Sequence, residues 1–584
     1  MNYPIYISSS SDDEDEVQEH INRQQHVTTI VNDEKRIYQA ALLDLNQPKT
    51  EKDLPPGVLA VPLMRHQKIA LEWMRQKERS FNNCLGGILA DDQGLGKTIS
   101  TIALILLQKL KSQSKPRSRR SGGTLVVCPA SVVKQWAKEL DDKVSLQHKL
   151  SVLVYHGSKR TNDPVELAKY DVVVTTYALV TNEVPQNSQS NIQFSGALAR
   201  VRWLRVVLDE AQTIKNHKTL VAKACSRLNA KRRWCLSGTP IQNEVWDLFS
   251  YFKFLQYHPY AEICSFSQRI MVPITKDSLR GYKKLQAILR GILLRRTKGT
   301  LLDGQPILHL PPKTVNLTKA EFSPEEFDFY KGLEATSQSE FEAYADAGTV
   351  NKNYVYILVM LLRLRQACDH PQLVKTSKEP YGDHHLRVKQ SDFTSTKIKA
   401  VMKTLESQVK TLVFSQWTGM LDLLEHNFVK NGVTFRRLDG TMSLVTRDKA
   451  VKEFNNDPSV QVMLMSLKAG NLGLNMVSAS HVIILDLWWN PTTEDQAIDR
   501  AHRIGQTRAV TVTRITINDT IEDRILALQE EKRIVTMVRP VSAKFLTALI
   551  TMAAALASSP VVGSSMNMID GFATNSTATV IHAY

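Results

Sequence analysis

A short stretch near residue 90 combines glycines, a lysine and a hydroxyl residue at the spacing of a phosphate-binding loop. It reads LADDQGLGKTIS, follows the strand-like run GGIL and precedes the helix-like run TISTIALILLQKL. Gly94 and Gly96 would let backbone N–H groups close around phosphates at a helix N-terminus. Lys97 would reach the β- and γ-phosphates, and Thr98 would place its hydroxyl on Mg²⁺. Because the first glycine of the full pattern is absent, the stretch alone also fits an ordinary turn before a helix.

A second stretch, RVVLDEAQTIKN, is an apolar run that ends in two adjacent carboxylates, Asp209 and Glu210. The carboxyl edge of a parallel sheet is where such folds bind their ligands. Asp209 could hold Mg²⁺ directly or through water, and Glu210 could orient and deprotonate the attacking water. A capping pair at a helix start is the structural alternative. The GKT loop about 110 residues upstream favours a nucleotide site over that alternative.

A third stretch, EDQAIDRAHRIGQT, places Gln496, Arg500 and Arg503 on one face of a predicted helix. Solvated surface arginines are the plain interpretation. Arginines from a second lobe could instead reach across to the γ-phosphate, where such a residue is worth roughly 10³–10⁵ in rate. Hydrolysis would then depend on closure of the two lobes.

The elements around these residues alternate between apolar strand-like runs and helical patterns, with a helical interruption over about 245–390. This alternation predicts parallel sheets with right-handed crossovers. We therefore predict an α/β fold of two lobes, with parallel sheets flanked by helices and a helical insertion between them. The expected ranges are 1–35 for an acidic disordered N-terminal segment, 56–244 for lobe 1, 245–394 for the helical insertion and inter-lobe linker, 395–535 for lobe 2 and 536–584 for an atypical tail.

Composition narrows the cellular context. Lys and Arg number 74 against 58 Asp and Glu, which gives a net charge of +16 and fits a polyanionic partner. The six cysteines form no CxxC pair, which favours a reducing compartment over a zinc finger. We expect an intracellular, soluble protein, since no signal peptide opens the chain and the apolar run 545–557 is too short to span a bilayer. The basic stretch 109–123 fits a nuclear import signal or a solvated loop equally well.

Taken in order, these stretches resemble the SWI/SNF family of superfamily 2 DNA-dependent ATPases over about residues 56–535. Asp91 is the family's usual residue where the full phosphate-loop pattern has its first glycine. The stretches SLKAGNLGLN and LLRLRQACDHP resemble in sequence the helicase-like transcription factor branch. The matching motifs are PLMRHQ (62–67), ADDQGLGKT (90–98), VVCPASVVKQW (126–136), LDEAQTIKN (208–216), LSGTPIQN (236–243), VFSQW (413–417), RLDGTMS (437–443), SLKAGNLGLNM (466–476), DLWWNP (486–491) and DQAIDRAHRIGQ (495–506).

The resemblance implies that the two lobes, 56–244 and 395–535, are RecA-like ATPase lobes, and it implies roles for individual residues. Gln67 would contact the adenine, and the nucleotide-binding set would also include Asp92, Gly94, Gly96, Lys97, Thr98 and Gln496. Hydrolysis would be coupled to lobe movement by Ser237, Gly238 and Thr239. DNA phosphates would be held from lobe 1 by Pro129, Ala130, Ser131, Thr175 and Thr176, and from lobe 2 by Ser415, Gln416, Trp417, Gly470, Gly473 and Asn475, with Trp489 near the tracked strand. Phosphate contacts carry no sequence information, so little sequence preference and strong salt dependence are expected.

Three features depart from the family pattern. Gln212 stands where most members have His, and hydrolysis should survive because the metal and base residues precede it. Only about 20 residues without cysteine separate Val374 from Ser395, so we expect no inserted RING finger there. After IEDRILALQEEKR and the six residues IVTMVR, the chain turns to PVSAKFLTALITMAAALASSPVVGSS, which matches nothing in the family.

The function expected from the resemblance is ATP- and Mg²⁺-dependent translocation on double-stranded DNA. The output would be chromatin remodelling or displacement of DNA-bound proteins, in transcription regulation or DNA repair in the nucleus. Two alternatives stay open, namely a strand-separating helicase and a non-hydrolysing scaffold that binds DNA or SUMO. Ile5-Tyr6-Ile7 followed by acidic residues resembles a SUMO-interacting motif, although a solvated acidic tail is the plainer interpretation.

Overall fold

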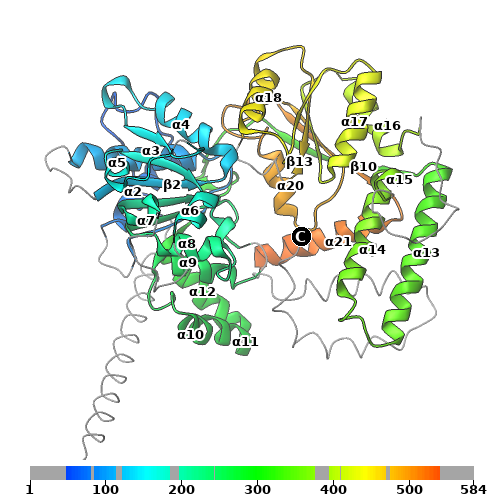
Figure 1. Cartoon of the computed structure of the whole chain (residues 1–584), viewed down its shortest axis with the longest axis horizontal. Helices are drawn as coiled ribbons and strands as arrows, with labels where there is room; N and C mark the ends of the chain where they lie inside the picture. The colour runs from blue at the N-terminus through cyan, green and yellow to red at the C-terminus, as the bar shows by residue number, and fades with distance from the viewer. Residues whose placement is uncertain are drawn as a thin grey trace, which may run out of the picture.

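The computed structural model describes residues 48–79, 84–112, 121–158, 160–184, 196–241, 244–374, 393–407, 409–467 and 474–538. These residues form two α/β bodies, each built on one parallel sheet, which lie next to each other in Figure 1. The prediction of two parallel sheets flanked by helices is therefore confirmed.

The first sheet has seven strands that pair in parallel throughout. Its middle strands are almost wholly buried because helices cover both faces, which explains why the sequence shows continuous apolar runs there. In sheet order the strands are β3 (Val152–Val154), β4 (Val172–Thr176), β2 (Ser121–Cys128), β5 (Arg202–Asp209), β6 (Ala230–Leu236), β1 (Gly86–Leu89) and β7 (Leu293–Leu294).

Alternate residues of these strands enter two separate apolar clusters, as expected when successive side chains point to opposite faces. One face is covered by α2 (Arg65–Lys77), α3 (Lys97–Ser112) and α4 (Val133–Asp142). The other face is covered by α5 (Pro164–Ala168), α6 (Tyr177–Glu183), α7 (Ala197–Arg200), α8 (Leu220–Arg227), α9 (Asp247–Leu255) and α12 (Ser278–Ile292), with α10 (Ile263–Phe266), the π-helix η5 (Ser267–Met271) and α11 (Val272–Lys276) alongside. Short 3₁₀ turns are η1 (Ala130–Val132), η2 (Leu146–His148) and η4 (Ala211–Ile214).

The second sheet has six strands, again all parallel. In sheet order they are β10 (Lys313–Ala320), β15 (Val510–Ile517), β14 (His481–Ile484), β11 (Thr411–Ser415), β13 (Val462–Ser466) and β12 (Phe435–Leu438). One face packs on α18 (Leu444–Asn456) and α20 (Pro491–Ile498), and the other on α16 (Thr396–Leu405) and α17 (Thr418–Lys430).

A long helix pair extends from the second body, as Figure 1 shows for α13 (Pro324–Asp346) and α14 (Tyr354–Asp369). Ser323 and Glu326 form a capping box at the start of α13, which fixes where that helix begins. The base of the pair packs in one apolar cluster with α21 (Ile521–Val538). The short helix α15 (Pro371–Val374) follows α14, and a small antiparallel hairpin joins β8 (Leu301–Leu302) to β9 (Gln305–Pro306).

The segment 245–394, expected as a helical insertion and inter-lobe linker, is divided between the two bodies. Residues up to Leu294 belong to the first body, because α9 and α12 lie in its core and β7 pairs with β1. Residues from Lys313 onward belong to the second body, because β10 pairs with β15 along its whole length. Each sheet therefore recruits a strand from outside the expected ranges 56–244 and 395–535.

Several expected features lie outside the described residues. These are Ile5-Tyr6-Ile7 and the rest of the acidic segment 1–35, the basic residues 113–120, Gly470, Gly473 and the tail beyond residue 538. Among the described helices, none has the length and apolar character needed to cross a bilayer.

Candidate active site

The phosphate-loop stretch lies between β1 and α3, at the carboxyl edge of the first sheet. Gly94 and Gly96 have φ values of 88° and 84°, a region that residues with a Cβ rarely adopt. A Cβ on Gly96 would lie 2.4 Å from Nε2 of Gln67, so the loop and the N-terminal half of α2 are in direct contact. Gln67 is held by its bonds to the backbone N–H of Met64 at 3.0 Å and the carbonyl of Leu95 at 3.2 Å.

Lys97 is the first residue of α3, and its ammonium group folds back over the loop. Its Nζ donates to the carbonyl oxygens of Asp91 at 2.7 Å and Asp92 at 3.3 Å. The loop therefore holds a lysine at the helix N-terminus, where anions bind readily.

The two aspartates of the loop face the segment that follows β7. Asp91 is buried and accepts a fork of hydrogen bonds from the Arg296 guanidinium, with Nε–Oδ1 at 3.0 Å. Arg296 also donates to the carbonyl of His66 at 2.7 Å. Asp92 accepts a bond from the backbone N–H of Lys298 at 3.1 Å, and burial raises the pKa of Asp92. The Asp91 side chain points into this contact. The contact explains why an aspartate stands where the full phosphate-loop pattern has its first glycine.

Asp209 ends β5 and is half-buried. Its Oδ2 accepts a hydrogen bond from Trp136 Nε1 of α4 at 2.7 Å, and its Oδ1 accepts one from the backbone N–H of Glu210 at 3.0 Å. Burial, and then the neighbouring Glu210 charge, raise the pKa of Asp209 to about 7, while the Trp136 bond and the Lys97 charge lower it. The carboxylate would be stabilised by an added positive charge.

Glu210 follows in a left-handed backbone conformation with φ of 49°, which turns the chain sharply from β5 into η4. Its carboxylate oxygens accept bonds from two amides, Gln93 Nε2 at 3.4 Å and Gln212 Nε2 at 2.8 Å. The Gln212 side chain in turn accepts a bond from Ser237 Oγ at 2.8 Å. The residue where most family members have His therefore orients the candidate base.

This chain of bonds continues into the second body. Ser237 Oγ accepts the backbone N–H of Thr239 at 3.2 Å, and Thr239 Oγ1 accepts a bond from Gln496 Nε2 at 3.3 Å. Gly238 lies over the phosphate loop, since a Cβ there would be 3.0 Å from Gln93 Cγ. The three predicted coupling residues thus lie between the candidate base and α20.

The two arginines of the third stretch approach the loop from the second body. Arg500 is buried and donates Nη2 to Gln93 Oε1 and Nε to the carbonyl of Gln496 at 3.0 Å. Burial lowers the pKa of Arg500 to about 10. Arg503 packs on Gly94, where a Cβ would lie 2.8 Å from the Arg503 Cβ, and its Nη1 donates to the carbonyl of Leu474 at 3.1 Å. The predicted arginines and the phosphate loop are therefore in contact in this structure.

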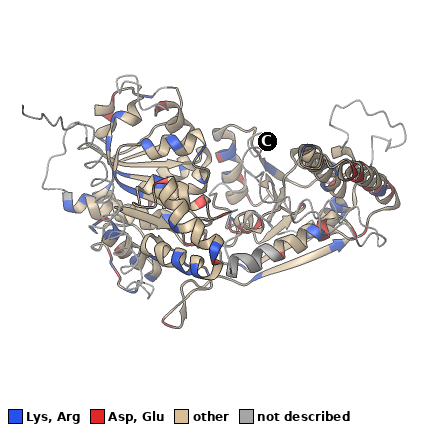
Figure 2. Ribbon diagram, turned by 90° about the horizontal axis from the view of Figure 1, so that it is seen from below, with Lys and Arg blue, Asp and Glu red and all other residues tan. Residues whose placement is uncertain are grey.

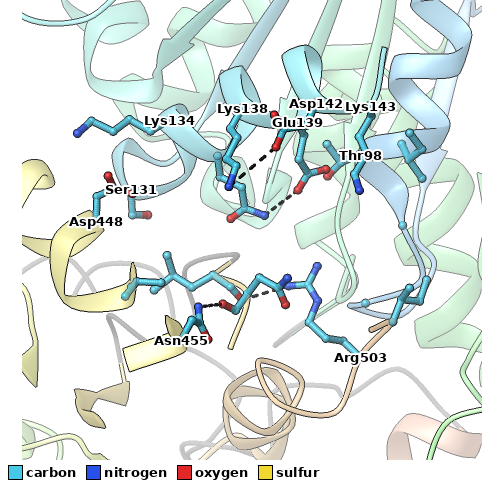
Figure 3. Close-up of a pocket in the computed structure, with 18 of the residues that line it drawn as sticks. Thr98, Ser131, Lys134, Lys138, Glu139, Asp142, Lys143, Asp448, Asn455 and Arg503 are labelled. Atoms are coloured by element: carbon cyan, nitrogen blue, oxygen red, sulfur yellow. Dashed lines mark hydrogen bonds and ion pairs between the residues drawn. The ribbon is translucent and has the colours of Figure 1, made fainter. Parts of the chain in front are cut away.

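A cavity of about 680 Å³ opens beside these groups, between the two bodies. Figure 3 shows Thr98, Lys138, Glu139 and Asp142 on the first-body wall, with Asn455 and Arg503 opposite. The lining also includes Gln67, Gly94, Gly96, Ala130, Ser131 and Asn475. The cavity is large enough for a ligand of nucleotide size, because its volume falls in the range of about 300–1,000 Å³ that is usual for ligand pockets.

Two residues fit a divalent cation at this site. Asp209 supplies a half-buried carboxylate whose ionised form is favoured by nearby positive charge, and Thr98, directly after Lys97, lines the cavity. Mg²⁺ commonly uses one or two protein ligands and completes its shell with phosphates and water. The donor set therefore suits Mg²⁺ bound together with a nucleotide.

The lobe 1 residues predicted to hold DNA fall into two groups. Pro129 caps η1, and Ala130 and Ser131 line the cavity, with Ser131 Oγ buried and without a hydrogen-bond partner in the described structure. Thr175 is fully buried and donates to the carbonyl of Tyr155 at 3.1 Å, whereas Thr176 caps α6. In this conformation both threonine hydroxyls are bound inside the protein.

The described lobe 2 residues cluster beyond β11 and β14. Ser415 Oγ donates to Asp486 Oδ2 at 2.5 Å, and Gln416 N donates to Asp486 Oδ1 at 2.9 Å. Burial raises the pKa of Asp486 to about 6. Gln416 Nε2 and Trp417 Nε1 are buried and have no hydrogen-bond partner among the described residues. Asn475 lines the cavity, and its carbonyl accepts a bond from Asn455 at 3.0 Å.

Trp489 lies on one side of an arginine that the sequence analysis did not single out. The Arg365 guanidinium of α14 is 4.8 Å from the Trp489 ring centroid and 5.8 Å from that of Trp417. It also donates to the carbonyl of Leu487 at 2.5 Å. Arg365 therefore holds together the two predicted DNA-contacting tryptophans.

Other residues at the site were also missed. Gln93 and Trp136 lie inside quoted motifs but carry no recognisable catalytic chemistry. Arg296 and Lys298 lie about 200 residues from the loop they contact, and the charged run RRTK after an apolar LL was the available signal.

Two protein-family models match most of the chain. The SNF2-related domain model matches residues 66–373, and the helicase conserved C-terminal domain model matches residues 396–505. Helicase-like transcription factor CHR28 of Arabidopsis thaliana is 47% identical over 757 residues, covering 86% of this chain and 77% of that protein. Since 757 exceeds the 584 residues of this chain, the relative has internal residues that this chain lacks.

More distant relatives include DNA repair protein RAD5A of Arabidopsis thaliana, which is 33% identical over 77% of this chain and 57% of its own length. Among solved structures, the Sulfolobus solfataricus SWI2/SNF2 ATPase core in complex with double-stranded DNA is 31% identical, with a TM-score of 0.39, covering 86% of this chain and 96% of that one. The chain belongs to the SNF2-related ATPase family with a helicase C-terminal domain and is related to the helicase-like transcription factors.

Proposed function

We propose that this ATPase is a translocase on double-stranded DNA that uses closure of its two bodies to drive each step. The observation that carries the proposal is the run of hydrogen bonds that leaves the second body at Arg500, passes through Gln93, Glu210 and Gln212, and returns through Thr239 to Gln496. The candidate base is thereby linked to the second body at two nearby residues, Gln496 at the end of α20 and Arg500 just beyond it. A change in the spacing of the bodies must alter the surroundings of Glu210.

In the proposed reaction, the phosphate loop and Lys97 bind the β- and γ-phosphates, and Gln67 contacts the adenine. Asp209 and Thr98 would hold Mg²⁺, and the bound ion would neutralise phosphate charge. Glu210 orients and deprotonates the attacking water, because each of its carboxylate oxygens can accept a further hydrogen bond beside the one from Gln93 or Gln212. Arg500 and Arg503 then stabilise the charge that develops on the transferred phosphoryl group.

DNA binding is proposed at Ser131 of the first body and at Gln416 and Trp417 of the second. Each has a buried polar atom without a hydrogen-bond partner in the described structure, a condition that a ligand commonly relieves. The net charge of +16 favours a polyanion, and Figure 2 shows Lys and Arg on both bodies. Thr175, Thr176, Ser415, Asn475 and Trp489 complete the proposed set, with the two threonine hydroxyls released by a local rearrangement.

The proposed output is movement of DNA past a nucleosome or another bound protein. The relatives named for transcription and DNA repair support a nuclear role in one of these processes. SUMO recognition through Ile5-Tyr6-Ile7 stays a prediction, because those residues lie outside the described structure.

A triplex-displacement assay with the full chain tests translocation directly. We expect ATP-dependent release of a third strand from duplex DNA, lost in Lys97→Ala and Glu210→Gln. A forked duplex without a third strand should stay paired. Unwinding of the fork would establish a helicase, and DNA binding with no release in either substrate would establish a scaffold.

A further inference from the structure

A lysine in the segment after β7 connects the phosphate loop to the arginine-bearing region of the second body. Its backbone N–H donates to Asp92 Oδ2 at 3.1 Å, which fixes Lys298 to the loop. Its side chain then crosses to the other body, where Nζ lies 2.5 Å from Asp499 Oδ1 and donates to the carbonyl of His502 at 2.5 Å. We call these contacts the Lys298 bridge.

The bridge is well placed to act on the candidate arginines. Asp499 and His502 directly precede Arg500 and Arg503 in the chain. A Cβ on Gly94 would lie 3.7 Å from Lys298 Cε and 2.8 Å from Arg503 Cβ, so the lysine stem, the loop and Arg503 pack together. The side chains of Lys298 and Asp499 are 18% and 17% exposed, so water screens the pair only partly.

We propose that Lys298 is a positioning residue for ATP hydrolysis, holding the 499–503 segment at the distance from the phosphate loop that the arginines need. The inference rests on the proposed function, since it assigns a role in the same site. Nucleotide phosphates bind mainly to the first body, so loss of the bridge should leave ATP affinity nearly intact. The bridge acts when Arg500 and Arg503 must approach the reacting phosphoryl group, so its loss should lower kcat.

The test measures ATP turnover of the full chain at saturating duplex DNA, together with equilibrium binding of a fluorescent ATP analogue. Lys298→Asp and Asp499→Lys should each lower kcat about tenfold, with nucleotide affinity changed less than about threefold. The double charge swap should recover turnover to within about threefold of the parent chain, and Lys298→Arg should retain most of it.

A matched control uses an exposed ion pair inside the second body, Lys319 with Asp523 at 3.0 Å. Swapping those two charges should leave kcat unchanged. Additive losses in the Lys298/Asp499 double swap, or equal losses in affinity and kcat, would overturn the positioning role.

Hydrogen exchange separates failure of this inference from failure of the proposed function. Lys298→Met should speed amide exchange over 499–503 in the full chain whether or not the protein turns over ATP. An unchanged exchange rate there would refute the bridge. Faster exchange in Lys298→Met, together with no ATP turnover by the parent chain, would retain the bridge as a contact and refute hydrolysis.

Discussion

Trp136 should set the pH at which the nucleotide site becomes active. Its indole N–H donates to Asp209 Oδ2 at 2.7 Å, while burial holds the pKa of Asp209 at about 7. Trp136→Phe keeps an aromatic ring and removes this donor. Because the hydrogen bond stabilises the ionised carboxylate, its loss must raise the pKa of Asp209 further.

The size of the shift follows from the strength of the bond. A hydrogen bond to a charged group is worth about 1.5–3 kcal/mol. One pKa unit corresponds to about 1.36 kcal/mol, so the pKa should rise by about one to two units. The ionised fraction of Asp209 falls as the pH drops below its pKa. Each unit below it should therefore reduce activity about tenfold, and the variant should lose activity at a higher pH than the parent chain.

The assay is kcat/KM for ATP between about pH 5.5 and 9.5 at saturating duplex DNA, since this ratio reports the groups of the free enzyme. Trp203→Phe is the matched control, because Trp203 is equally buried and its Nε1 donates to the carbonyl of Leu198 at 3.0 Å within the core. The acid side of the pH–activity curve should move upward by about one to two pH units in Trp136→Phe alone. If a folded Trp136→Phe variant has the same acid side as the parent chain, the link between Trp136 and Asp209 is refuted.

Three further predictions address stability and turnover. Lys397 is fully buried between Asp369 at 2.8 Å and Glu522 at 2.7 Å. Lys397→Met should lower the free energy of unfolding by about 3–5 kcal/mol in urea titrations, because two buried carboxylates lose their cation. The exposed neighbour Lys399→Met should change it little, and equal effects would contradict the burial argument. Gln93→Met should raise DNA-free ATP turnover about fivefold, because it releases both Glu210 and Arg500 from an amide contact. A fall in that rate would instead make Gln93 part of the active arrangement. Arg503→Ala should reduce kcat by about 10³ while nucleotide binding changes only a few-fold, and equal losses in both would remove its proposed role.

Local sequence signals predicted the elements that carry the chemistry because each signal lies within one short segment. The glycines of the phosphate loop stand between a strand and a helix, and Asp209 ends an apolar run, so both positions follow from adjacent residues. The spacing of Gln496, Arg500 and Arg503 placed them on one helix face, but it offered their contact with the phosphate site only as an alternative to solvated arginines.

Contacts between distant segments could not be predicted from the chain alone. The role of Asp91 follows only from its contact with Arg296, which lies just after strand β7. That strand has two residues and is too short to show a sequence pattern. Strand β10 was missed because seven of its eight residues are exposed and its apolar positions do not mark a buried face. The burial of Thr175 was equally hidden, since threonine suits both a strand interior and a phosphate contact.

The central claim is that this site hydrolyses ATP in response to double-stranded DNA. The most direct measurement is the steady-state ATP turnover of the full chain with and without duplex DNA, beside Glu210→Gln. We predict turnover that rises with DNA and disappears in the variant, while DNA binding persists in both. DNA binding without ATP turnover in the parent chain, or undiminished turnover in Glu210→Gln, would contradict it.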